Sequence, residues 1–198
     1  MQNIKNRMSE QLFENINMFT EINEEEFQGI LPFFDFRSLR KKEIIVKEGN
    51  KCNFNHFVLK GCLQMFFISG NGTEQTIRFA IENIWMTDYL AYQNRTVSDF
   101  YIQAVEDTQI LSITKDKEEK LLNQFPKLEK YFRIVYQTSY GKSLLMIKYL
   151  YGFSKKDIYF HFTKELPELA QRIPQYLIAS FLGLTPEYLS KIKNRKRS

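Results

Sequence analysis

The stretch from Ile178 to Ile192 reads IASFLGLTPEYLSKI, in which one glycine separates two short segments with helical spacing. Helix-turn-helix units need a small residue where the two helices cross and a residue that tolerates a positive φ in the turn. If Gln175 is counted as the first position, Ala179 falls at the fifth position and Gly183 at the ninth. The fourth, eighth, tenth, fifteenth and eighteenth positions are apolar, namely Ile178, Leu182, Leu184, Leu189 and Ile192. The spacing therefore predicts two helices that pack at a fixed angle.

The second of these helices is predicted to begin at Thr185 and Pro186. A threonine hydroxyl can cap a helix, and proline fits the first helical position, where no amide donor is needed. Because a helix turns about 100° per residue, Leu189 and Ile192 define the buried side and a polar set faces outward. The outward set is Glu187, Ser190, Lys191 and Asn194, with Tyr188 and Arg195 along one flank.

The polar side of this helix has the chemistry to read DNA. Lysine can donate to guanine, asparagine can pair with adenine, and glutamate can accept from the amino group of cytosine. Lys193, Lys196 and Arg197 are better placed for phosphates, and such contacts would make affinity fall as salt rises. The alternative is a solvated helix face that binds nothing. The predicted DNA-binding residues are Thr185, Glu187, Tyr188, Ser190, Lys191, Lys193, Asn194, Arg195 and Lys196.

The distribution of charge favours an anionic partner for this end of the chain. The formal net charge is +5 over 198 residues, and residues 187–198 alone carry +4. The remaining residues are therefore close to neutral. Basic tails that face only solvent are also common, so charge alone does not decide between a DNA-binding helix and a solvated one.

The composition indicates a globular protein with a sizeable core, since 43% of the residues are hydrophobic. Cys52 and Cys62 lack the number and spacing of a disulfide framework or a zinc site, which favours a reducing cytoplasm. The polar amino terminus lacks the apolar core of a secretory signal, and no apolar run approaches the roughly 20 residues of a membrane helix. We therefore expect a cytoplasmic protein with no membrane partner.

The pattern of the chain changes twice along its length. Residues 9–31 have the spacing of short helices, and residues 38–113 contain short β-branched and aromatic runs separated by turn residues, which predicts seven or eight antiparallel strands. From Pro126 to Tyr151 a helical pattern continues without another proline. The sequence thus predicts an α+β protein. The expected parts are an antiparallel β-roll with amino-terminal helices over 1–125, a long helix over 126–151 and a helix-turn-helix unit over 152–198.

One side of the long helix carries a stripe with 4-3-4-3-4-3 spacing, which is typical of a helix that meets another helix. The stripe is Leu128, Phe132, Val135, Ser139, Lys142, Met146 and Tyr149. It predicts a dimerisation helix. The alternative is that the same side packs on its own β unit, because Ser139 and Lys142 weaken the stripe, although Gly141 would permit close backbone approach.

The chain resembles the Crp/Fnr superfamily of bacterial transcription regulators, most closely its short Bacteroidetes-type subgroup, over roughly residues 12–196. The resemblance rests on EIIVKEGNKCNFNHFVLKGCLQMFF with Gly49 and Gly61 at β-roll turns, on EDTQILSI, and on PELAQRIPQYLIASFLGLTPEYLSKI. It implies a β-roll, a long dimerisation helix and a carboxy-terminal DNA-binding domain whose homodimer reads a two-fold-related operator. It also implies RNA polymerase as a partner.

The resemblance raises the question of an effector. In cyclic-nucleotide-binding relatives a Gly-Glu pair and a later Arg-Ser-Ala or Arg-Thr-Ala run hold the ribose and the cyclic phosphate. The corresponding stretches here read Thr87-Asp88 and Val97-Ser98-Asp99, so the phosphate-pairing arginine is replaced and a carboxylate repels the anion. We therefore expect neither cyclic AMP nor any cofactor, and either another effector binds or aromatic side chains fill the pocket. The possible effector-pocket residues are Trp85, Thr87, Asp88, Tyr89, Arg95 and Ser98.

The sequence offers no catalytic or metal-binding constellation. His56 and His161 are far apart, and neither has a cysteine or carboxylate at metal-ligand spacing. Because the sequence ends at Ser198, we expect no wing after the second helix, and a wing before the helix pair would have to fit within residues 152–174, which have a mostly helical pattern. The leading hypothesis is a homodimeric DNA-binding transcription regulator rather than an enzyme. The alternative is an effector- or partner-binding β-roll whose terminal helices make protein contacts.

Overall fold

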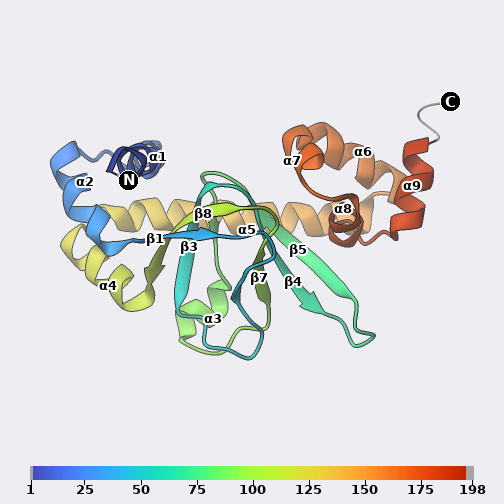
Figure 1. Ribbon diagram of the computed structural model, residues 1–198, viewed down its shortest axis with the longest axis horizontal. Coiled ribbons are helices and arrows are strands. Elements are labelled where there is room, and N and C mark those ends of the chain that lie inside the picture. Colours follow the sequence, from blue (N-terminus) through green and yellow to red (C-terminus); the bar gives the residue numbers. More distant parts are fainter. Residues whose placement is uncertain (1, 195–198) are drawn as a thin grey trace. The chain divides into compact units, whose positions relative to one another are not determined.

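The computed structural model describes residues 2–194 of the chain, with side chains described from residue 10 to residue 193. The fold is α+β, with two four-stranded sheets, a 25-residue helix and a group of carboxy-terminal helices, which confirms the predicted fold class (Figure 1). The chain forms two compact units. The first unit comprises Met1–Met65 and Phe79–Thr138, and the second unit comprises Phe66–Arg78 and Ser139–Ser198. None of the helices in the described part is long and apolar enough to cross a membrane.

The described residues include eight strands, within the number expected. They are β1 Asp35–Leu39, β2 Ile44–Val46, β3 Phe54–Lys60, β4 Leu63–Ile68, β5 Glu74–Ala80, β6 Trp85–Met86, β7 Tyr101–Ala104 and β8 Thr108–Thr114. One sheet has the order β1-β8-β3-β6, and the other has the order β2-β7-β4-β5. The edge strands are therefore β1 and β6 in the first sheet, and β2 and β5 in the second.

Strand β3 lies between β8 and β6, and its central residues are buried on both faces. It pairs with β8 in antiparallel fashion, with His56 opposite Ser112 and Phe57 opposite Leu111. Phe57 and Leu111 belong to one core cluster, whereas Val58 belongs to another. Burial on both faces explains why Phe57, Val58 and Leu59 are apolar in succession instead of alternating with polar residues.

The two glycines expected at β-roll turns both have a positive φ. Gly49 has φ +80° and Gly61 has φ +102°. A Cβ at position 61 would lie 2.8 Å from the carbonyl oxygen of Asp107, so the turn between β3 and β4 leaves no room for a side chain.

The first unit contains several helices besides its strands. They are α1 Gln2–Asn17, α2 Glu24–Ile30, the 3₁₀ turn η1 Leu31–Phe33, α3 Tyr89–Asn94 and α4 Lys115–Gln124, and the long helix α5 Leu128–Gly152 begins in this unit. Leu12 and Ile16 of α1, Trp85 of β6 and Phe132 of α5 belong to one core cluster. The Phe132 and Trp85 rings lie 5.4 Å apart between their centroids.

The predicted stripe of α5 packs on its own chain. Leu128 and Phe132 are buried in the core of the first unit, and Val135 packs against that core. Further along the helix, the Tyr149 ring lies 4.4 Å from the His161 ring between centroids. These four side chains of the stripe thus contact their own chain, and the dimerisation helix stays a prediction.

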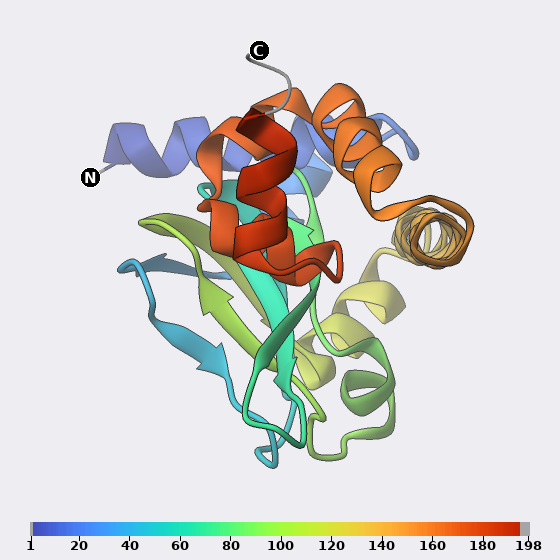
Figure 2. The same cartoon turned by 90° about the vertical axis from the view of Figure 1, so that its right-hand side faces the viewer.

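The second unit contains residues 66–78, which end β4, turn and begin β5, the rest of α5 and four shorter helices. These helices are α6 Lys155–Glu165, α7 Pro167–Arg172, α8 Gln175–Phe181 and α9 Pro186–Asn194, and Figure 2 shows α9 nearest the viewer, in front of α8. The Ser154 hydroxyl accepts from the backbone N–H of Asp157 and caps α6. Residues 152–174, all of them described, contain no strand.

Candidate functional site

Helices α8 and α9 form the predicted helix-turn-helix pair. The apolar residues expected to lock them together are all buried, namely Ile178, Leu182, Leu184, Leu189 and Ile192, and so is Ala179. Gly183 has φ +65°, the left-handed conformation that the turn requires and that glycine adopts without strain. The backbone N–H of Leu184 donates to the Ala179 carbonyl oxygen at 2.8 Å, which closes the turn.

Helix α9 begins as its sequence predicts. The Thr185 hydroxyl oxygen accepts from the backbone N–H of Tyr188 at 3.2 Å, and Pro186 is the first helical residue. The cap satisfies one of the amide groups that have no partner within the helix. The helix extends to Asn194, whose side chain is not described, and the predicted contacts at Arg195 and Lys196 lie outside the described residues.

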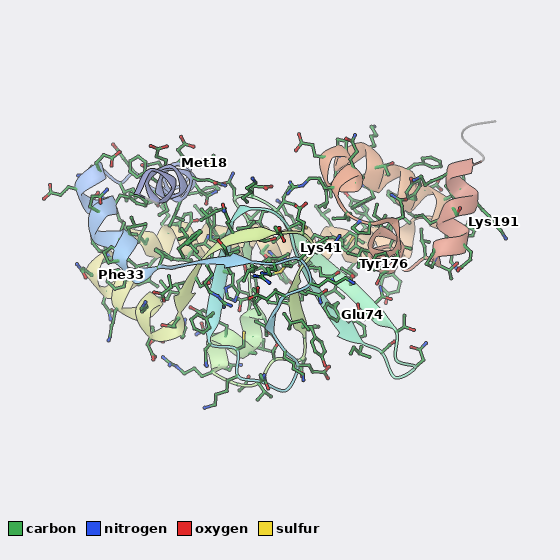
Figure 3. All side chains as sticks on the ribbon, in the orientation of Figure 1. Met18, Phe33, Lys41, Glu74, Tyr176 and Lys191 are labelled. Atoms are coloured by element: carbon green, nitrogen blue, oxygen red, sulfur yellow. The ribbon has the colours of Figure 1, made fainter. Side chains whose placement is uncertain are left out.

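The outer side of α9 is polar and exposed. Glu187, Ser190, Lys191 and Lys193 are all exposed, while Leu189 and Ile192 are buried on the other side. In Figure 3 the Lys191 side chain extends away from the other helices of the second unit. Within the described part of the chain, none of the charged residues on this side forms an ion pair. The surface therefore presents unneutralised lysines and hydrogen-bonding groups to solvent.

The carboxy-terminal end of α8 is bound to strand β5 within the second unit. The Ser180 hydroxyl donates to the carbonyl oxygen of Glu74 at 2.8 Å and accepts from the backbone N–H of Thr76 at 2.8 Å. The side-chain amide of Gln75 donates to the Ser180 carbonyl oxygen. One residue of the helix pair thus engages three consecutive residues of an edge strand, a contact that the sequence does not predict.

In the β-roll, Asp88 is satisfied by its own chain. One carboxylate oxygen accepts from the backbone N–H of Ala91 at 3.1 Å and caps α3. The other accepts from the Ser98 hydroxyl at 3.0 Å and from the Asp99 backbone N–H at 3.3 Å. Asp88 and Ser98 are both buried. The two residues are therefore brought together, as a pocket would require, but they bind each other.

Three other candidate pocket residues are also bound within the first unit. The Thr87 hydroxyl donates to the Phe54 carbonyl oxygen at 2.8 Å and contacts the Cys52 sulfur at 3.2 Å. The Trp85 indole N–H donates to the Tyr131 hydroxyl at 2.8 Å, and the Tyr89 ring packs edge-on against Tyr136. Burial raises the pKa of the Cys52 thiol, so this cysteine stays protonated.

Arg95 is the pocket candidate that does not join this group. It ends α3 with φ +57° and donates to Asp116 at 2.5 Å and to Glu119 at 2.9 Å, both at the surface in α4. Val97, which stands where the resemblance would require the phosphate-pairing arginine, is 52% exposed. The described residues thus offer no arginine directed at the Asp88 and Ser98 pair.

A buried carboxylate that the sequence does not reveal joins α3, α4 and α5. Glu118 is 2% exposed, and one of its oxygens accepts from the hydroxyls of Tyr92 and Tyr136, each at 3.2 Å. Its other oxygen lies 3.1 Å from the Lys115 ammonium. Burial and the neighbouring Glu118 charge raise the pKa of Tyr92, which remains a neutral donor. These hydrogen bonds hold α3, the helix that precedes the loop with Ser98, against α4 and α5.

His56 lies in the centre of β3 and is almost fully buried. Its Nδ1 lies 2.8 Å from the Ser112 hydroxyl, and Nε2 has no hydrogen-bond partner among the described residues. Burial lowers the pKa of His56 to about 3, because the interior disfavours the imidazolium. No group of three or more potential metal-ligating side chains occurs in the described part of the chain.

The β-roll part of the chain matches a known family of domains. Residues 36–125 match the family model described as the cyclic nucleotide-binding domain. No curated protein matches the chain in sequence.

Three solved regulators have a similar fold over most of the chain. The c-di-GMP responsive global regulator CLP of Xanthomonas campestris has a TM-score of 0.71 at 11% identity, covering 88% of this chain and 92% of that one. A protein assigned to the Crp/Fnr family of transcriptional regulators, from Eubacterium rectale, has a TM-score of 0.69 at 16% identity, covering 89% and 84%. The catabolite activator protein of Thermus thermophilus has a TM-score of 0.58 at 16% identity, covering 91% and 85%. At these identities the likeness shows the fold, and all three are described as regulators or activators instead of enzymes.

Proposed function

We propose that the chain is a sequence-specific DNA-binding transcription regulator that acts as a homodimer in the cytoplasm. The observation that carries this proposal is the helix pair α8 and α9, with its left-handed Gly183, its capped second helix and its exposed, unpaired lysines. The fold shared with solved transcription regulators supports it. RNA polymerase is the partner that the family resemblance implies.

In this proposal α9 enters the major groove. Helix-turn-helix proteins place the second helix there, with its first residues against base edges. Glu187, Ser190, Lys191 and Asn194 then read bases, while Lys193, Arg195 and Lys196 bind phosphates. Thr185 and Tyr188 lie at the start of the helix, where they contact the groove edge.

The exposed side of α5 supports the homodimer. Tyr140, Leu144, Ile147 and Tyr151 recur with 4-3-4 spacing, and their exposed fractions lie between 48% and 89%. This row lies roughly opposite the stripe that packs on its own chain, since a helix turns about 100° per residue. Large apolar side chains in a heptad row on a helix surface are typical of a helix that pairs with another copy.

We also propose that cyclic AMP is not the effector. Asp88 already accepts three hydrogen bonds from its own chain, and the cyclic phosphate would meet Val97 and the Asp99 carboxylate instead of an arginine. Cyclic AMP at about 1 mM is therefore expected to leave the unfolding midpoint unchanged. A ligand at 100 times its Kd would add about 2.7 kcal/mol to the free energy of unfolding, so a clear rise in thermal stability would contradict this proposal.

The test of the function is selection of bound sites from random duplex DNA with the purified protein. A palindromic motif is expected, because a two-fold dimer presents two copies of α9. Failure of the protein to retain bulk DNA at low salt would reject the proposal. The terminal helices would then be protein-contact elements of a β-roll module.

Replacing Lys191 by alanine is expected to weaken binding to the selected site by about 1–3 kcal/mol and to relax the preference at one base position, because a lysine contact to a base edge is lost. Lys47→Ala is the control, since Lys47 is an exposed lysine in the first unit. Repeating the selection with both variants measures the effect. An unchanged motif for Lys191→Ala would remove this residue from the base-reading surface.

A further inference from the structure

A cation from another helix lies beside α9. Lys155 is the first residue of α6, and its ammonium nitrogen lies 5.9 Å from the centre of the Tyr188 ring on α9. A cation within about 6 Å of an aromatic face is attracted by the negative charge density of the ring. Tyr188 is itself 38% exposed, so the pair stands at the surface. The ring therefore holds the Lys155 charge against the flank of α9, although the two residues are far apart in sequence.

The Lys155 charge is not neutralised by a carboxylate. In the first unit, Lys115, Lys117 and Lys127 each lie within 3.1 Å of an acidic oxygen. Among the residues that the structure describes, neither Lys155 nor Lys191 has such a partner. Two lysines from separate helices of the second unit thus have no acidic partner.

The dimensions of DNA indicate what this cation would meet. A helix with its side chains is about 10–12 Å across, and the major groove is about 12 Å wide, so a recognition helix fills the groove from wall to wall. A charge displaced sideways from the helix by the breadth of a tyrosine ring then stands over the wall of the groove, which is lined with phosphates. It does not stand over the base edges.

We propose that Lys155 binds a DNA phosphate on one flank of α9, and that Tyr188 positions its ammonium group for this contact. The inference rests on the proposed function, and it extends the DNA interface to α6. Phosphate contacts fix the position and orientation of a recognition helix and carry no sequence information of their own. Lys155 would therefore set how α9 lies in the groove and contribute affinity to every sequence alike.

The test is the salt dependence of binding by Lys155→Gln. Each phosphate contact contributes about 0.9 to the slope of log K against log salt, so the loss of one contact per subunit lowers the slope of a dimer by about 2. The selected motif is expected to stay the same. Lys164→Gln is the matched control, because Lys164 is an exposed lysine in the last turn of the same helix, and its slope should equal that of the unaltered protein.

The role of the tyrosine ring is tested separately. Tyr188→Phe keeps the aromatic face and should retain the full slope, whereas Tyr188→Ala should lower the slope although it removes no charge. The double variant with Lys155→Gln and Tyr188→Ala should then have a salt slope only slightly lower than that of Tyr188→Ala alone. An unchanged slope for Lys155→Gln, an equal loss for Lys164→Gln, or a changed motif would overturn the inference. If the unaltered protein shows no salt-dependent DNA binding, the proposed function itself fails.

Discussion

The double substitution Leu144→Glu and Ile147→Glu is expected to convert a dimer into monomers and to lower affinity for a palindromic operator by at least about 100-fold. In the proposed dimer, four carboxylates would face one another across the α5 helices, where exposed apolar side chains would otherwise make contact. When one α9 of a dimer is bound, the second α9 is held close to the second half-site. Its effective concentration there is high, which raises the affinity of the dimer by about 10²–10⁴. Sedimentation measures the assembly, and gel-shift titration measures the affinity.

The matched control is Lys142→Glu, on roughly the opposite side of the same helix. It also introduces carboxylate charge at an exposed position, and it should leave the dimer intact. Both variants should fold, since the altered side chains are exposed in the monomer, and circular dichroism checks this. A double variant that remains dimeric would show that the exposed row of α5 is not the interface.

A second large effect is expected in acid. His56 has a pKa of about 3 in the folded chain and an ordinary value of about 6.5 when unfolded. Its contribution to stability is therefore fully present above pH 6.5 and is lost as the pH falls from 6.5 toward 3, because the unfolded state binds the proton first. At about 1.36 kcal/mol per pH unit, the loss reaches about 2 kcal/mol at pH 5.

The measurement is urea unfolding at pH 7 and pH 5 for the unaltered protein and for His56→Gln. Glutamine keeps a polar group near the Ser112 hydroxyl but does not titrate, so the difference in stability between the two pH values should shrink by about 2 kcal/mol. The carboxylates common to both proteins cancel in this comparison. Equal pH dependence in the two proteins would mean that His56 takes up its proton without unfolding.

The parts of the fold that could be predicted are those specified by neighbouring residues. Gly183 in the turn and Thr185 at the cap are local signals, because a positive φ and an unpaired amide have short-range chemical solutions. The eight short strands likewise follow from β-branched runs and turn residues. These features need no knowledge of the rest of the chain.

The parts that could not be predicted depend on residues brought together from distant elements. Both sides of α5 carry large apolar residues. The sequence therefore shows the helical spacing of these residues, but it does not show which side packs on its own chain. Glu118 lies in a run of charged residues, and nothing local indicates that Tyr92 and Tyr136 would enclose it. The hydrogen bond between Asp88 and Ser98 likewise depends on how the intervening loop folds back, which the local sequence does not specify.

The contact between Ser180 and strand β5 has a consequence for any shortened form of the chain. Strand β5 is at the edge of its sheet, and the Ser180 hydroxyl occupies the outward-facing carbonyl of Glu74 and N–H of Thr76. A fragment that ends before α8 would leave both groups open, and uncovered sheet edges recruit strands from neighbouring molecules. We therefore expect a fragment without the terminal helices to associate through this edge of β5.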